Sequence, residues 1–286
     1  MPMDIFALHD VQVRVKEKTI LRIKEKPIHI SRGDVVGIIG ENGAGKTTLI
    51  RVLLDLIKYE GNVERNISFR SIGVQMQKNG FSGLLKVYEL ISFICNSSIK
   101  NPQLAEKMKD FQIDHLLQKR VESLSGGELQ RLTLFLVLYR DPEVLIFDEI
   151  TTGLDYQNRQ MVLKYLQKIM NNKTVLIVTH YYEEIEKLAN KLLILHKGKL
   201  MDYDSVDRLF AKYEVYSTIA MKKEEFPKNW SEKAYETEDK VIVINASQKE
   251  EEERIRIIRK NNYTYDYKKR DFYSLFHKII EQCGAE

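Results

Sequence analysis

The chain has 286 residues, of which 43% are hydrophobic and 30% charged, and its formal net charge is +4. This length leaves room for one large domain, or for a domain of about 200 residues with a small companion. A charge balance this close to neutral does not favour nucleic acid as a partner, and no apolar run approaches the ~18 residues that a membrane helix needs.

The cysteines and the N-terminus point to an intracellular protein. Cys95 and Cys283 supply neither a disulfide framework nor a metal-binding spacing, so we expect two reduced thiols in a cytoplasmic protein. The opening residues, Met1-Pro2-Met3-Asp4, lack the pattern of a signal peptide.

Short strands are expected in the first forty residues. Residues 5–8, 11–15 and 28–30 form short apolar or alternating runs, and a turn at residues 32–34 leads into an apolar run at 35–39. The β-branched content of that last run predicts a buried strand.

A glycine-rich string follows this strand and opens a predicted helix over residues 46–54. It reads Gly40-Glu41-Asn42-Gly43-Ala44-Gly45-Lys46-Thr47-Thr48. Glycines permit positive φ and close backbone approach, so the string predicts a nest of N–H groups and a helix N-terminus around phosphates. We expect Lys46 to reach the β- and γ-phosphates, Thr47 to ligate Mg²⁺ and Thr48 to add a phosphate hydrogen bond. The expected phosphate contacts are Asn42, Gly43, Ala44, Gly45, Lys46, Thr47 and Thr48.

The middle of the chain predicts an α/β core with a helical insert. Strands are expected at residues 71–74, 144–147, 174–178 and 192–195, and the last three are nearly pure Val, Ile and Leu. Helices at 157–170 and 182–190 separate them, so we predict a mostly parallel, layered sheet. The insert covers about residues 78–138, with helices at 86–95, 102–118 and 128–138.

A different pattern begins after residue 211, where a short helix ends that Asp204 or Ser205 is expected to cap. Strands at 215–221, 241–245 and 263–269 and helices at 248–260 and 271–282 predict a small α+β accessory domain over 212–286. Its aromatic residues either pack internally or form a contact surface; they are Tyr263, Tyr265, Tyr267, Phe272 and Phe276.

Three motifs together carry a family resemblance. The glycine-rich loop is followed by Leu124-Ser125-Gly126-Gly127-Glu128 and then by Val144-Leu145-Ile146-Phe147-Asp148-Glu149. In this order they resemble the ATP-binding subunits of ABC transporters, over roughly residues 4–210. The resemblance implies a P-loop NTPase core of the ABC type, with a mixed, mainly parallel sheet, an antiparallel N-terminal part and a helical insert within residues 1–211. It also implies ATP and Mg²⁺ as ligands and ATP hydrolysis coupled to transport.

The same resemblance implies a head-to-tail dimer in which each ATP lies between two copies. One copy supplies the phosphate loop, and the other supplies Ser125, Gly126, Gly127 and Glu128. The small residues make a donor-rich helix start that suits a γ-phosphate.

The candidate catalytic residues are Lys46, Glu149 and His180. Asp148 ends a buried strand, where its carboxylate can hold Mg²⁺ directly or through water. By resemblance Glu149 activates the attacking water, and His180 is the histidine that contacts the γ-phosphate. The other five histidines are expected to be structural or on the surface.

Three further positions follow from the resemblance. Gln77 is expected to contact Mg²⁺ and water, with Gln75 as the rival choice. Asp155 is expected to contact the partner copy near its phosphate loop. Val15 or Lys16 stands where the family stacks adenine on an aromatic ring, and neither can stack in that way.

The leading functional interpretation is a transporter motor, cytoplasmic and peripheral on the inner face of the membrane. Its partners would be a second copy or a homologous ATPase subunit, together with separate transmembrane permease subunits. Residues 271–276 resemble the tails of bacterial exporter ATPases, which favours export of a drug, peptide or lipid-like substrate. The alternative is a soluble ABC ATPase acting in translation or DNA maintenance, and a non-catalytic module is disfavoured because Lys46, Asp148, Glu149 and His180 are all present.

Overall fold

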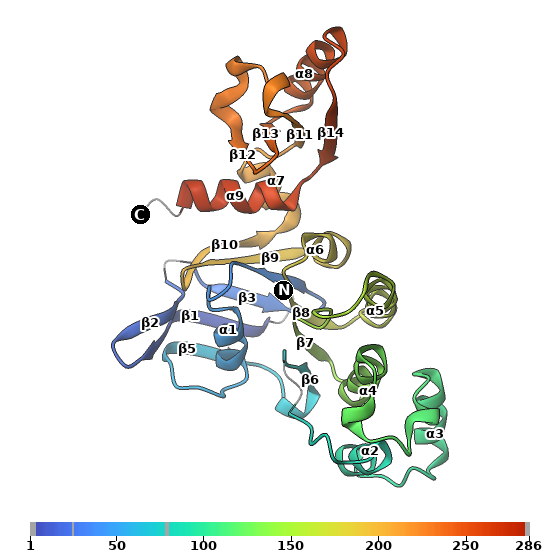
Figure 1. Ribbon diagram of the computed structural model, residues 1–286. Helices are drawn as coiled ribbons and strands as arrows, with labels where there is room; N and C mark the ends of the chain where they lie inside the picture. The colour runs from blue at the N-terminus through green and yellow to red at the C-terminus, as the bar shows by residue number, and fades with distance from the viewer. Residues whose placement is uncertain (1–3, 25, 78–79, 284–286) are drawn as a thin grey trace.

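Two sheets organise the chain in the computed structural model, which describes residues 4–24, 26–77 and 80–283 (Figure 1). The larger sheet has ten strands, in the order β3-β1-β2-β10-β9-β4-β8-β7-β6 with β5 paired to β1. Its strands are β1 Asp4–Val15, β2 Lys18–Arg22, β3 Ile28–Ser31, β4 Val35–Ile39, β5 Glu60–Arg65, β6 Ile72–Gln75, β7 Val144–Asp148, β8 Thr174–Val178, β9 Lys191–His196 and β10 Lys199–Ser205.

The five strands β9, β4, β8, β7 and β6 pair in parallel, while β1 pairs antiparallel with β2, β3 and β5. Every residue of β7 and β8 is buried, as expected for strands covered on both faces. The helices of this part are α1 Lys46–Leu53, α2 Val87–Cys95, α3 Pro102–Asp110, α4 Gly126–Leu138, α5 Tyr156–Ile169, α6 Tyr182–Leu188 and α7 Val206–Lys212. The predicted α/β class, with its antiparallel N-terminal strands, is confirmed.

Several predicted elements differ in extent. The two strands expected at 5–8 and 11–15 form one strand, β1, whose pairing shifts register near Asp10, a residue with φ of 51°. The helix expected over 102–118 ends at Asp110, because Gln112 adopts a left-handed φ of 54° that a helix cannot continue. Ser205, rather than Asp204, caps α7 through its hydroxyl.

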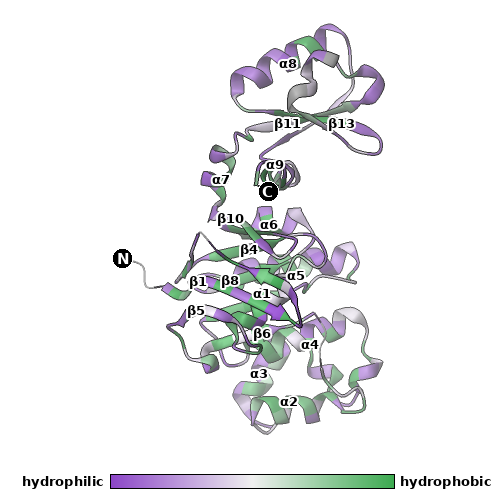
Figure 2. Cartoon of the chain, turned by 90° about the vertical axis from the view of Figure 1, so that its left-hand side faces the viewer, coloured by the Kyte–Doolittle hydropathy of each residue, from purple (hydrophilic) through white to green (hydrophobic). Residues whose placement is uncertain are grey.

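The second sheet lies at one end of the molecule, opposite the insert helices α2 and α3 (Figure 2). Its order is β12-β13-β11-β14, and all its pairs are antiparallel. It comprises β11 Ser217–Lys222, β12 Ala234–Glu236, β13 Lys240–Asn245 and β14 Tyr265–Lys269. Helix α8 Gln248–Lys260 lies between β13 and β14 in the chain, and helix α9 Phe272–Cys283 follows β14. Its own core contains Ile219, Met221, Trp230, Val243 and Ile258.

Helix α9 joins the two parts. It lies between the small sheet and the β9–β10 hairpin in Figure 1. Leu275 and Ile279 are fully buried in one cluster with Ile39, Ile185 and Leu192 of the larger part. Two aromatic residues offered as a contact surface, Phe272 and Phe276, are buried in this cluster, while Tyr267 is exposed.

A polar cluster around Asp202 of β10 lies beside the same junction, because its partner Tyr213 packs in the α9 cluster. The buried Asp202 carboxylate accepts hydrogen bonds from Lys26 Nζ at 2.6 Å, Lys212 Nζ at 2.6 Å and the Tyr213 hydroxyl at 2.9 Å. Burial alone would raise the pKa of Asp202, but these donors outweigh it and hold the pKa at about 2.

Among the described helices, none has the length and apolar content to cross a bilayer.

Candidate functional site

The loop between β4 and α1 closes around the amine of Lys46. Lys46 Nζ donates to the carbonyl oxygens of Gly40 at 2.8 Å and Glu41 at 3.0 Å. Gly45 occupies the N-cap of α1, and no described side chain caps this helix. The first N–H groups of α1 are therefore available to an anion.

Two glycines explain why the loop needs residues without side chains. Gly43 has a φ of 79°, and a Cβ there would meet nothing within 4 Å, so its backbone faces open space. Gly45 has a φ of 99°, and its Cβ would lie 3.2 Å from the Ile20 carbonyl oxygen. Any other residue would be strained at both positions, which fits a loop that presents its backbone to phosphates.

A candidate cation site lies where β7 ends beside α1. Asp148 is 1% exposed, and its Oδ2 accepts a hydrogen bond from the Thr47 hydroxyl at 2.9 Å. Its Oδ1 is buried and has no hydrogen-bond partner among the described residues. Burial raises the pKa of Asp148, because its present contacts do not make up for the loss of water around the charged carboxylate. An oxygen-seeking cation such as Mg²⁺ would satisfy this atom, so Thr47 and Asp148 fit the ligand set expected for it.

Lys46 lies near the carboxylates of Asp148 and Glu149. It is buried, and burial lowers the pKa of its amine, although the charges of Glu149 and Asp148 act in the opposite direction. A bound polyanion would favour the charged amine.

Glu149 is the centre of a second cluster. It has a left-handed φ of 57°, and its N–H donates to the Val178 carbonyl at 2.9 Å. Gln77 Nε2 donates to Glu149 Oε2 at 2.7 Å, and His180 Nε2 lies against Glu149 Oε1. Three predicted residues from three separate loops thus meet at one carboxylate, beside Asp148.

The structure separates the two glutamine candidates. Gln75 is buried and pairs with Gln130 of α4, with amide contacts of 3.2 and 3.4 Å. Gln77, and not Gln75, therefore contacts Glu149. Sequence reasoning missed Gln130, although a polar residue on the buried face of the predicted helix was a signal for it.

The motif at residues 124–128 forms the capped start of α4. The Ser125 hydroxyl accepts from the Glu128 N–H at 3.3 Å, and Glu128 Oε2 accepts from the Ser125 N–H at 2.8 Å, which is a capping box. Lys119 Nζ contacts Glu128 Oε1 at 2.8 Å. The hydrogen bonds from Lys119 and from the Ser125 N–H lower the pKa of Glu128 to about 2.

The carboxylate of Glu128, expected among the ATP contacts, is therefore engaged in the cap of its own helix. A Cβ at Gly127 would lie 3.1 Å from Asn158 Oδ1, so a side chain there would require Asn158 to shift. In Figure 1 α4 lies beside α2 and α3 rather than beside α1. The described contacts do not bring Ser125, Gly126 or Gly127 to Glu149.

The described contacts do not bring Asp155 or Val15 to Glu149 either. Asp155 caps α5, because its carboxylate accepts from the Asn158 N–H at 2.9 Å and from the Asn158 side-chain amide at 2.7 Å. These bonds lower the pKa of Asp155. Val15 is exposed at the end of β1, next to Lys16, which has a φ of 55°.

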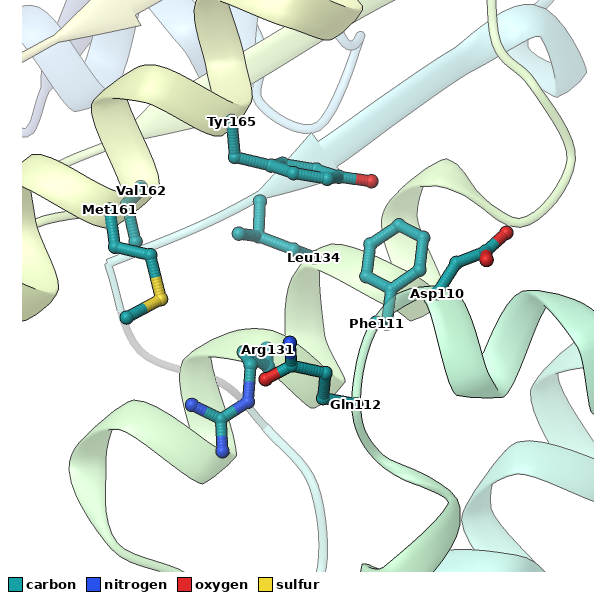
Figure 3. Close-up of a pocket in the computed structure, with 8 residues that line it drawn as sticks. All are labelled: Asp110, Phe111, Gln112, Arg131, Leu134, Met161, Val162 and Tyr165. Atoms are coloured by element: carbon teal, nitrogen blue, oxygen red, sulfur yellow. The ribbon is translucent and has the colours of Figure 1, made fainter.

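A separate cavity of about 170 Å³ lies between α3, α4 and α5 (Figure 3). The rings of Phe111 and Tyr165 bound it together with Leu134, and Arg131 lies at its edge. It includes none of the predicted phosphate or catalytic residues, so it is not part of the candidate site at the ends of β4, β7 and β8.

Comparison with known proteins identifies the family. The family model described as ABC transporter matches residues 23–152. The Nod factor export ATP-binding protein I of Paraburkholderia xenovorans is 30% identical over 215 residues, covering 70% of each chain. The chain belongs to the ABC transporter ATP-binding family. This ABC ATPase binds ATP and couples its hydrolysis to transport.

Other relatives and structures agree on the family and the fold. The methionine import ATP-binding protein MetN of Streptococcus thermophilus is 29% identical over 268 residues, covering 83% of this chain and 72% of that protein. The structure of cbiO1 from Clostridium perfringens, part of an ABC transporter complex, has a TM-score of 0.61 at 25% identity, covering 74% and 92%. A structure of an ATP-binding subunit of an ABC transporter has a TM-score of 0.64 at 19% identity, covering 73% and 93%, and supports the fold. Because the relatives' names include both import and export, they do not favour the export predicted from residues 271–276.

Proposed function

We propose that this ABC ATPase is the motor subunit of a transporter and works as a head-to-tail dimer beneath separate permease subunits, at the inner face of the membrane. The observation that supports it most is the convergence of Gln77 and His180 on the Glu149 carboxylate, beside the Thr47–Asp148 pair. This arrangement suits phosphoryl transfer to water, which needs positioning and charge stabilisation.

In this proposal the loop at residues 40–48 holds the triphosphate, and Lys46 moves from its backbone partners to the β- and γ-phosphates. Thr47 and Asp148 would hold Mg²⁺, and the bound ion would neutralise charge on the phosphate oxygens. Asp148 offers its unpartnered Oδ1 for this task.

Glu149 orients the attacking water and takes its proton. Both of its carboxylate oxygens are engaged in this structure, one by Gln77 and one by His180. Each oxygen can still accept a second hydrogen bond, so a water can bind Glu149 beside Gln77 or His180. Gln77 follows β6 at the start of the insert region, so a movement of the insert would change access to Glu149.

The second copy contributes the start of its α4. The Ser125 hydroxyl accepts from the Glu128 N–H, which leaves its own proton to donate to a γ-phosphate of the partner's ATP. Glu128 acts by stabilising this helix start. Asp155 would meet the partner near its phosphate loop, and Val15 would offer adenine an aliphatic contact, so we expect the base to add little affinity.

The permease is expected to dock on the insert region. Apolar side chains are exposed there: Phe93 is 83% exposed and Leu84 is 69% exposed. Aromatic residues are enriched at protein interfaces, so this exposure favours a docking surface. Export of a drug, peptide or lipid-like substrate rests only on the likeness of residues 271–276 to exporter tails. Because Phe272 and Phe276 pack at the α9 junction, that likeness has a packing explanation, and the methionine-import relatives favour uptake as the second candidate.

Co-purification with a membrane protein tests the transporter role. The tagged chain, isolated from its native cells, should float with membranes, retain ATP turnover and bring a membrane protein with it. Phe93→Asp should lose the membrane partner and keep ATP binding. Leu56→Asp is the matched control, because Leu56 is an exposed apolar residue (63%) just after α1, away from the insert. Co-sedimentation with ribosomes or DNA, with no membrane partner, would support the soluble alternative instead.

A further inference from the structure

A buried carboxylate outside the proposed catalytic set connects two catalytic loops. Glu184, in the first turn of α6, is 2% exposed. Its Oε1 accepts from the Thr151 hydroxyl at 2.7 Å, and its Oε2 accepts from the Thr179 hydroxyl at 2.7 Å. Thr151 and Thr179 are themselves 1% and 4% exposed. Each carboxylate oxygen thus has one buried donor, and each donor comes from a different loop.

The two donors flank the proposed catalytic residues. Thr151 lies two residues after Glu149, in the loop that follows β7. Thr179 directly precedes His180, in the loop that follows β8. Because β7 and β8 are parallel neighbours with Asp148 opposite Val178, both loops leave the same edge of the sheet.

The direction of the Thr179 hydroxyl is set by a further contact. Its oxygen accepts from the Tyr181 N–H at 3.0 Å, so its proton is free to point at Glu184. A carboxylate buried in this way is costly unless donors satisfy it, and hydrogen bonds to a charged acceptor are short and strong. Glu184 therefore favours the arrangement in which both loops stay in place.

Glu149 needs such support. Its left-handed φ of 57° is a conformation that residues other than glycine rarely adopt, and the surrounding contacts must hold it. The Thr152 N–H bonds to the Glu149 carbonyl at 3.1 Å, which makes a tight turn that ends beside Thr151. Fixing Thr151 therefore fixes the turn that presents Glu149.

We propose that Glu184 is a positioning residue for ATP hydrolysis, whose buried carboxylate holds the Thr151 and Thr179 hydroxyls and thereby fixes the spacing of Glu149 and His180. The proposal rests on the proposed roles of Glu149 and His180. Because Thr151 also leads into residues 152–155, the same carboxylate links the catalytic loops to the segment expected at the dimer interface.

The test removes each hydroxyl without changing side-chain shape. In Thr151→Val and Thr179→Val, we expect kcat to fall by about ten- to hundredfold, as for a small misplacement of catalytic groups. The KM for ATP should stay within about twofold, since the phosphate loop is untouched. Thr151→Ser and Thr179→Ser retain the hydroxyl and should recover most of kcat.

Thr174→Val is the matched control. Thr174 is a buried threonine at the opposite end of β8, and its hydroxyl accepts from the Gly33 N–H at 3.0 Å. Its loss should lower the urea midpoint of unfolding without the fall in kcat. Should the valine variants fail to fold, Glu184→Gln keeps the side-chain volume, and its kcat gives the same test.

Three results would overturn the proposal: a kcat within about twofold of wild type in the variants at 151, 179 and 184, an equal fall in the Thr174→Val control, or serine variants no better than valine. Glu149→Gln distinguishes this failure from failure of the proposed function. If Glu149→Gln abolishes turnover while the valine variants keep it, only the positioning role of Glu184 is wrong.

Discussion

Leu275 on α9 is predicted to stabilise both parts of the chain at once. It is fully buried in the cluster that also contains Ile185 and Leu192 of the larger part. Leu275→Ala leaves a cavity there, and such substitutions destabilise by about 2–5 kcal/mol. Ile258→Ala is the matched control, because Ile258 is equally buried but packs in the small sheet's own core on α8.

Trp230 makes the two parts separately observable. It is the single tryptophan of the chain and is buried in the small core, so its fluorescence reports unfolding of that part. ATP binding reports the state of the larger part in the same urea series. With a urea dependence of about 3 kcal/mol per molar, a loss of about 3 kcal/mol moves a midpoint by about 1 M.

We expect Leu275→Ala to lower the urea midpoints of both signals, because α9 covers apolar residues of the larger part. Ile258→Ala should lower mainly the Trp230 midpoint. If Leu275→Ala shifts only the Trp230 signal and ATP binding persists to the wild-type urea concentration, then α9 belongs to the small part alone and the junction argument is wrong.

Three other predictions follow from single residues. Lys46→Ala should lose most ATP binding or turnover, because the triphosphate loses its main buried cation; wild-type turnover would refute the phosphate-loop assignment. Ser125→Arg should leave single-chain ATP binding nearly intact and block ATP-dependent dimerisation, and an equal loss of both in titration and size-exclusion experiments would argue against action across an interface. Asp202 has a folded pKa of about 2, below its unfolded value of about 3.9, so its contribution of about 2 kcal/mol is present above about pH 4 and is lost as pH falls toward 2. Asp202→Asn should remove that part of the acid dependence of the urea midpoint, and an unchanged dependence would exclude Asp202 as its source.

Much of the core was predictable because its residue types leave few choices. The mainly apolar strands β7 and β8 and the glycine-rich loop before α1 lie where the pattern placed them. The strands that the pattern missed, β2, β5 and β12, carry mainly polar or exposed residues and depend on backbone pairing with a neighbour. For β5 that neighbour is β1, which is distant in sequence, so a local pattern contains no signal for it. Strands β2 and β12 pair with β1 and β13 across short turns, and their exposed polar residues show no alternating apolar pattern.

The site divides in the same way. Asp148 and His180 were singled out by the family resemblance, and each lies at the end of a recognisable buried strand, where the structure also places it. The choice of Gln77 over Gln75 depends on which side chain points toward Glu149, and Gln75 is occupied by Gln130. Likewise the spacing of apolar residues predicted an apolar face on α9, but only the fold shows that this face packs on Ile39, Ile185 and Leu192 of the larger part.

The most direct test of the central claim is the behaviour of Glu149→Gln with ATP. The amide keeps the shape of the side chain and loses the base, so we expect ATP binding without turnover. ATP should then shift this variant from monomer to dimer in size-exclusion chromatography, with nucleotide retained in the dimer peak. Persistent turnover together with a monomer at saturating ATP would contradict both the role of Glu149 and the ATP-bound dimer.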